Sequence, residues 1–164
     1  MKITDTLTSL VSSALESTQS SGSLPPTGDF EINIERPKLT EHGDFSTSLP
    51  LALARTMRMS PIQIAEAISI AIPENEMIGM VEPAAPGFVN FTLSTSWLQS
   101  QVGVVRKAGT SFGSNDTGSG QSVQIEFVSV NPTGPLHVGH ARGAVIGSSL
   151  ANVLEANGYE VQRE

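Results

Sequence analysis

The chain has 164 residues, which suffices for one ordinary domain or for a small domain with a piece of another. Hydrophobic residues make up 38%, and the absence of cysteine with only three histidines excludes disulfides and speaks against a zinc site. A net charge of −7 argues against a generic basic nucleic-acid-binding protein. We find neither a signal peptide nor a run of about 20 apolar residues, and therefore expect a soluble cytoplasmic protein with no membrane contact.

The first third of the chain predicts two helices around one strand. Apolar residues recur at helical spacing over residues 3–15, up to the Ser-, Gly- and Pro-rich stretch 20–28. Alternating apolar and polar residues over 30–35 predict a half-buried strand. Residues 48–57 favour a helix, and we expect Asp44, in the turn before it, to cap that helix.

The next segment predicts a helix, a strand pair and a second helix. Ser60, Pro61 and Gln63 have the pattern of a capping box at the start of a helix that ends before Pro73. Residues 77–82 and 87–93 are typical of strands, and the short Pro-rich turn between them favours antiparallel pairing. A helix over 95–107 completes this part of the chain.

A polar, glycine-rich segment at residues 109–121 marks a linker. We therefore predict an N-terminal domain over residues 1–108 and a second domain that begins at residue 122. In the second domain, a strand over 123–130, a helix over 136–156 and a strand start at 159–162 form the opening of a βαβ unit. The predicted fold class is α/β: an α+β N-terminal domain with an antiparallel sheet, and over 122–164 the incomplete start of a Rossmann-type domain.

The segment that joins the predicted strand to the helix is SVNPTGPLHVGH, residues 129–140. His137 and His140 lie three residues apart in the first helical turn, where unpaired backbone N–H groups and the helix dipole favour a phosphate. Gly139 leaves room for a base or ribose, and Gly134 leaves room in the turn. The pattern predicts an ATP-binding turn, and the alternative is that both histidines only cap a surface helix.

These residues resemble the first signature of class I aminoacyl-tRNA synthetases, His-x-Gly-His, in the extended form found in arginyl-tRNA synthetases. Upstream, HGDFST at 42–47 and PGFVNF at 86–91 are similar to stretches of that family's N-terminal, tRNA-contacting domain. The resemblance implies an arginine–tRNA ligase that activates L-arginine with ATP and Mg²⁺, transfers it to tRNA(Arg) and acts as a monomer.

The resemblance also implies roles for residues around the signature. The catalytic pair is His137 and His140, and ATP contacts extend to Thr133, Gly134 and Gly139. Arginine contacts fall on Ser129, Val130, Asn131 and His140. Two positions depart from the family pattern, since Val130 stands where a smaller residue is usual and Ser148 where an acidic one is common. Arg142 either approaches a phosphate or the tRNA end, or faces solvent.

Phe88 and Asn90 are two residues apart on a predicted strand, so their side chains share a face. An aromatic ring beside an amide suits an extruded RNA base, and the resemblance assigns this stretch to the tRNA D-loop. The competing hypothesis is a core role for Phe88, because either this face or the face of Val89 and Phe91 must be buried. In so acidic a chain, RNA recognition depends either on local stacking and hydrogen bonds or on positive surface elsewhere.

The family's second signature, a Lys-Met-Ser-Lys-type loop, does not occur in these 164 residues. We therefore expect the isolated polypeptide to be inactive in arginine activation. Two alternatives remain at this level. One is a non-catalytic protein that only binds tRNA or regulates a complex, and the other is a different His-x-Gly-His nucleotidyltransferase without RNA contact.

Overall fold

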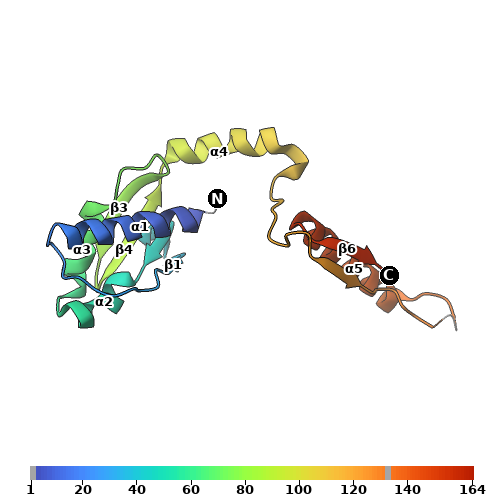
Figure 1. Cartoon of the computed structure of the whole chain (residues 1–164). Helices are drawn as coiled ribbons and strands as arrows, with labels where there is room; N and C mark the ends of the chain where they lie inside the picture. The colour runs from blue at the N-terminus through green and yellow to red at the C-terminus, as the bar shows by residue number, and fades with distance from the viewer. Residues whose placement is uncertain (1–2, 132–133) are drawn as a thin grey trace. The chain divides into compact units, whose positions relative to one another are not determined.

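A computed structural model describes residues 3–131 and 134–164. The chain divides into two compact units, one up to Val104 and one from Val105 onward (Figure 1). The division falls within helix α4 (Thr95–Ala108), a few residues before the predicted linker. No helix in these described ranges is long and apolar enough to cross a membrane.

The first unit is built on a four-stranded antiparallel sheet with strand order β1-β2-β4-β3. The strands are β1 (Ile34–Glu35), β2 (Phe45–Thr47), β3 (Ile78–Ala84) and β4 (Phe88–Leu93). The antiparallel pairing of β3 with β4 confirms the predicted strand pair. Strand β4 lies between β2 and β3. Its successive side chains alternate between the face of the sheet that packs on the core and the opposite face.

Three helices form the second layer of this unit (Figure 1): α1 (Ile3–Ser20), α2 (Leu49–Met57) and α3 (Pro61–Ala71). Helix α3 contacts β3 and β4 and packs against both other helices, so it is the centre of the helical layer. The core between the layers is aliphatic apart from two phenylalanines. Its fully buried members include Leu7, Val11, Leu53, Ile64, Ile68, Val89 and Phe91.

Three local predictions for the first unit are corrected by the structure. The strand predicted over 30–35 is reduced to Ile34–Glu35, because only these two residues pair with β2. Asp44 does not cap α2; its Oδ2 accepts a hydrogen bond from the backbone N–H of Leu93 at 2.8 Å and so fastens the turn to β4. Ser60 is the N-cap residue of α3 but makes no side-chain cap bond, so the capping box does not form.

The second unit begins as a βαβ arrangement, as predicted. Strands β5 (Ser122–Ile125) and β6 (Glu160–Arg163) pair in parallel, and α5 (Val138–Ala156) connects them. The strand predicted to reach residue 130 ends at Ile125. Three residues further on, Val128 has a φ of 63°, a left-handed conformation that interrupts an extended strand and is rare for a β-branched residue.

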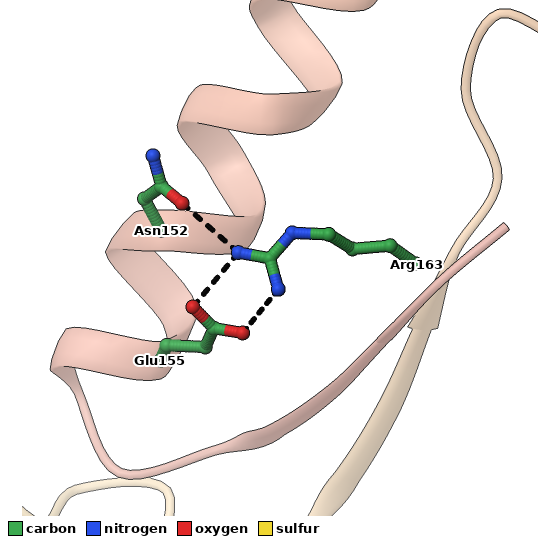
Figure 2. A network of polar contacts seen from close by, with 3 residues as sticks. All are labelled: Asn152, Glu155 and Arg163. Carbon is green, nitrogen blue, oxygen red and sulfur yellow. Dashed lines mark hydrogen bonds and ion pairs between the residues drawn. The ribbon is translucent and has the colours of Figure 1, made fainter.

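Side-chain and backbone contacts fasten the ends of α5 and β6 together. Arg163 on β6 donates to both carboxylate oxygens of Glu155 and to Oδ1 of Asn152 on α5 (Figure 2). The segment predicted as a linker also joins this unit, because the N–H groups of Asn115 and Gly118 donate to the carbonyls of Ala156 and Asn157 at 2.9 and 2.7 Å. Much of that glycine-rich segment is therefore bound to the end of α5.

Candidate functional site

The start of α5 brings the two predicted catalytic histidines together. His137 is the N-cap residue, and its Nδ1 accepts a hydrogen bond from the backbone N–H of Gly139 at 3.1 Å. In return, Nδ1 of His140 accepts from the backbone N–H of His137 at 3.3 Å. The two rings stack, with their centroids 3.7 Å apart. This reciprocal arrangement satisfies two N–H groups that a helix start leaves without intrahelical partners.

These caps fix which nitrogen of each ring carries the proton. An Nδ1 that accepts a backbone N–H bond carries no proton, so the neutral imidazole holds its proton on Nε2. His137 is exposed and His140 is half-buried, so both rings present an Nε2–H donor beside the positive end of a helix. Capping and anion binding are therefore compatible roles, because they use different nitrogens of the same ring.

Glycine at position 139 leaves room for the His137 ring in this arrangement. A methyl group on Gly139 would collide with the His137 ring, which lies over the first turn. Gly134 is exposed in the preceding segment, and the predicted ATP contact Thr133 lies outside the described residues. The glycine between the histidines thus permits the ring arrangement, in addition to the room for a ligand that the sequence suggests.

The predicted arginine contacts Ser129, Val130 and Asn131 lie in the irregular segment between β5 and α5, and all three are exposed. Arg142 and Ser148, which the sequence analysis singled out, are exposed on α5. The roles suggested for Ser129, Val130, Asn131 and Arg142 stay predictions.

In the first unit, Phe88 and Asn90 line a pocket of about 370 Å³. They occupy the face of β4 opposite to Val89 and Phe91, which are fully buried in the core. Phe88 is half-buried, so its ring borders the pocket while Phe91 fills the core. Phe91, three residues further along β4, is thus the fully buried phenylalanine of this strand, and the role of Phe88 at the pocket stays a prediction.

The same pocket contains residues that the sequence analysis did not assign to a site. Arg36, Lys38 and His42 come from the connection between β1 and β2, and Ser46 comes from β2. The guanidinium carbon of Arg36 lies 5.0 Å from the centroid of the Phe45 ring, which is a cation–π distance. The sequence did contain a signal for this pocket: the two cations Arg36 and Lys38 stand two residues apart in a chain that is acidic overall. Glu35 also lines the pocket, so Arg36 and Lys38 leave it with a small excess of positive charge that the net charge of the chain conceals.

Comparison with known protein families identifies a match in each of the two units. A family model described as "Arginyl tRNA synthetase N terminal domain" matches residues 5–93, and one described as "tRNA synthetases class I (R), catalytic domain" matches residues 104–164. The chain belongs to the arginyl-tRNA synthetase family. This confirms the family to which the signature and the two upstream stretches pointed.

Individual arginyl-tRNA synthetase relatives extend the match over nearly the whole chain. The arginine–tRNA ligase of Halorhodospira halophila is 46% identical over 157 residues, which cover 95% of this chain and 27% of that protein. That of Dehalococcoides mccartyi is 45% identical over 154 residues, 94% of this chain and 28% of that protein. The chain thus spans about a quarter of the length of the curated relatives it matches.

Solved structures of arginyl-tRNA synthetases share the α/β fold. The enzyme from Thermus thermophilus matches with a TM-score of 0.60 and 27% identity, over 99% of this chain and 25% of that one. The enzyme from Plasmodium falciparum matches with a TM-score of 0.69 over 98% of this chain and 29% of that one. Its identity of 16% supports the fold alone.

Proposed function

We propose that this chain carries the tRNA-contacting domain and the first ATP-binding signature of an arginine–tRNA ligase. Such an enzyme uses ATP to activate L-arginine and then transfers the arginine to tRNA(Arg). The observation that carries the proposal is the histidine pair at the start of α5, whose cap bonds direct two Nε2–H donors away from the helix backbone. The match of residues 5–93 to an N-terminal domain of this family argues against a nucleotidyltransferase without RNA contact.

Arginine activation consists of attack by the arginine carboxylate on the α-phosphate of ATP, which expels pyrophosphate. The enzyme positions the two reactants and stabilises charge on the phosphates, so no protein nucleophile is needed. In this proposal His137 and His140 donate to phosphate oxygens, Thr133, Gly134 and Gly139 shape the ATP-binding turn, and Ser129, Val130, Asn131 and His140 contact arginine.

In this proposal Mg²⁺ enters with the nucleotide and is held chiefly by its phosphates.

The pocket of the first unit is the proposed contact for an unstacked base of the tRNA D-loop. Phe88 supplies a ring for stacking, and Asn90 supplies an amide for the base edge. Arg36 and Lys38 border the same pocket and suit the phosphates that flank an extruded nucleotide. The proposal places the enzyme in the cytoplasm, because protein synthesis consumes charged tRNA in that compartment. It also includes a monomeric state, which the resemblance to the family implies.

A chimera tests the ATP-binding part of this proposal. Residues 1–164 replace the matching part of the Halorhodospira halophila arginine–tRNA ligase, and arginine-dependent pyrophosphate exchange is measured. His140→Ala should lower kcat by roughly two orders of magnitude, about 3 kcal/mol, with a smaller change in the KM for ATP. Ser149→Ala is the matched control, because Ser149 is exposed on the same helix.

The split between the kinetic constants decides the outcome. A contact that strengthens as charge moves toward pyrophosphate acts mainly on kcat. If His140→Ala raises only the KM for ATP and leaves kcat at the level of Ser149→Ala, the histidine binds ground state and transition state equally. The proposed role in charge stabilisation is then wrong.

A further inference from the structure

A second group of cations in the first unit lies where helix α2 ends. Arg55 is in the last turn of α2, Arg58 is its C-cap residue, and both side chains are exposed. Neither arginine forms an ion pair with a described residue, although the chain carries 16 Asp and Glu side chains. Two positive charges therefore face solvent without an intramolecular counterion, in a chain whose net charge is −7.

Arg58 also has an unfavourable backbone conformation. Its φ of 53° and ψ of 39° are left-handed, a conformation that glycine adopts easily and other residues adopt at a cost. The conformation ends α2, because the backbone N–H groups of Arg58 and Met59 both donate to the carbonyl of Ala54. Glycine is the usual residue at such a helix end, so the end of the helix explains the conformation but not the arginine.

The helix dipole explains the two arginines only in part. The negative end of a helix favours a cation in the last turn, but the cost of a left-handed residue other than glycine is roughly twice that gain. Arg55 and Arg58 are also three residues apart, close enough for their like charges to repel. Local costs that no intramolecular contact offsets are typical of a binding site.

The end of α2 is close to the pocket of the first unit. Ser48, which lines the pocket, is the N-cap residue of α2, and Arg58 at the other end lies about 15 Å away at the helical rise of about 1.5 Å per residue. The start of α3 packs on the β3–β4 turn, since a methyl group on Gly87 would lie 2.3 Å from Cβ of Pro61. Ala85 of the same turn lines the pocket. An RNA strand with a base in the pocket would reach the arginines within a few nucleotides.

We propose that Arg55 and Arg58 form a phosphate-binding site for the tRNA strand that continues from the pocket. A guanidinium group can donate two parallel N–H groups to one phosphate, which an unpaired and exposed arginine is free to do. The inference rests on the proposed function, because it assumes that the pocket holds an unstacked tRNA base. It adds a contact that reads no base and contributes alike to the affinity for every RNA sequence.

The test compares stability with RNA binding in the 164-residue chain. Arg58→Gly relieves the backbone cost, so its melting temperature should equal that of the unchanged protein or exceed it by a few degrees. Its affinity for tRNA(Arg) should fall about three- to tenfold at low salt, and the slope of log K against log salt should fall by about one. Arg58→Lys, which keeps the charge, should keep the slope. A purely structural role of Arg58 would give the opposite result, a lower melting temperature with unchanged binding.

Two further variants separate a local contact from a change in total charge. Lys107 is exposed on α4 and belongs to the other unit, so Lys107→Gln removes one positive charge elsewhere. It should change the salt slope much less than Arg58→Gly does, and an equal change would refute a local site. Arg55→Gln combined with Arg58→Gly should lower the slope by about two. A slope equal to that of Arg58→Gly alone would overturn the assignment of Arg55.

The outcomes also separate this inference from the function on which it rests. If Phe88→Ala weakens tRNA binding and Arg58→Gly does not, the phosphate site is refuted and the pocket stands. If neither variant weakens binding, the proposed RNA contact of the first unit is refuted together with the site. If only Arg58→Gly weakens binding, the arginines bind RNA without a base in the pocket, and the inference as stated is wrong.

Discussion

Phe88 and Phe91 are three residues apart on β4 and lie on opposite faces of it, which makes them a natural pair for mutation. Phe91 is fully buried in the core, whereas Phe88 is half-buried at the pocket. Removal of a fully buried phenylalanine ring costs about 3–5 kcal/mol of folding free energy. Loss of a stacking partner for one base costs about 1–3 kcal/mol of binding free energy.

The two substitutions should therefore have different effects. Phe88→Ala should weaken tRNA(Arg) binding by about ten- to a hundredfold with a small change in melting temperature. Phe91→Ala should lower the melting temperature of the first unit by more than about 10 °C, and the fraction that stays folded should bind tRNA normally. Titration with labelled tRNA and a thermal melt of each variant measure both quantities.

The reasoning fails if the two variants behave alike. A Phe88→Ala protein that melts as early as Phe91→Ala, yet binds tRNA normally while it is folded, would assign Phe88 to the core. The pocket would then lack its stacking surface, and the competing core role would be right.

Three other predictions follow from single contacts. Arg36→Ala should weaken tRNA binding for all D-loop sequences alike and lower the slope of log K against log salt by about one, as measured by titration at several salt concentrations. Residues 1–164 alone should show no arginine-dependent pyrophosphate exchange, because they contain no Lys-Met-Ser-Lys-type loop, and clear exchange would contradict this expectation. The hydrogen bonds and charge of Arg163 hold the pKa of Glu155 below its ordinary value of 4.5 (Figure 2). This pair therefore stabilises the fold above pH 4.5, and its contribution is lost as the pH falls through the lowered pKa. Glu155→Gln should lower the melting temperature slightly at pH 7, and this difference should shrink as the pH falls below 4.5; a difference that grows on acidification would be the wrong sign.

Much of the fold follows from local sequence patterns. Helical spacing placed a helix over 95–107, and the structure has α4 at Thr95–Ala108. Residues 87–93, whose composition is typical of a strand, likewise correspond to β4 at Phe88–Leu93. Such patterns are reliable because a core-facing side chain must recur with the period of its own element.

Local patterns failed where a distant partner competes for a polar group. Asp44 had a helix start nearby, but the backbone N–H of Leu93 lies within reach and takes its carboxylate. The strand predicted to reach residue 130 stops at Ile125, and Val128, three residues further on, has a φ of 63°, which does not fit an extended strand. A hydrogen bond between segments far apart in the chain leaves no periodic trace in either of them.

The sequence by itself determined the family, the α/β class and the pairing of two histidines on one helical turn, because each depends on residues that are close together in the chain. Only the tertiary structure decided that Arg36, Lys38, His42 and Ser46 share a pocket with Phe88 and Asn90. It also decided that Phe91 rather than Phe88 fills the core. The physical reason is that strand order and register set which side chains of distant segments meet, and a strand's own alternation defines two faces without specifying which one is covered.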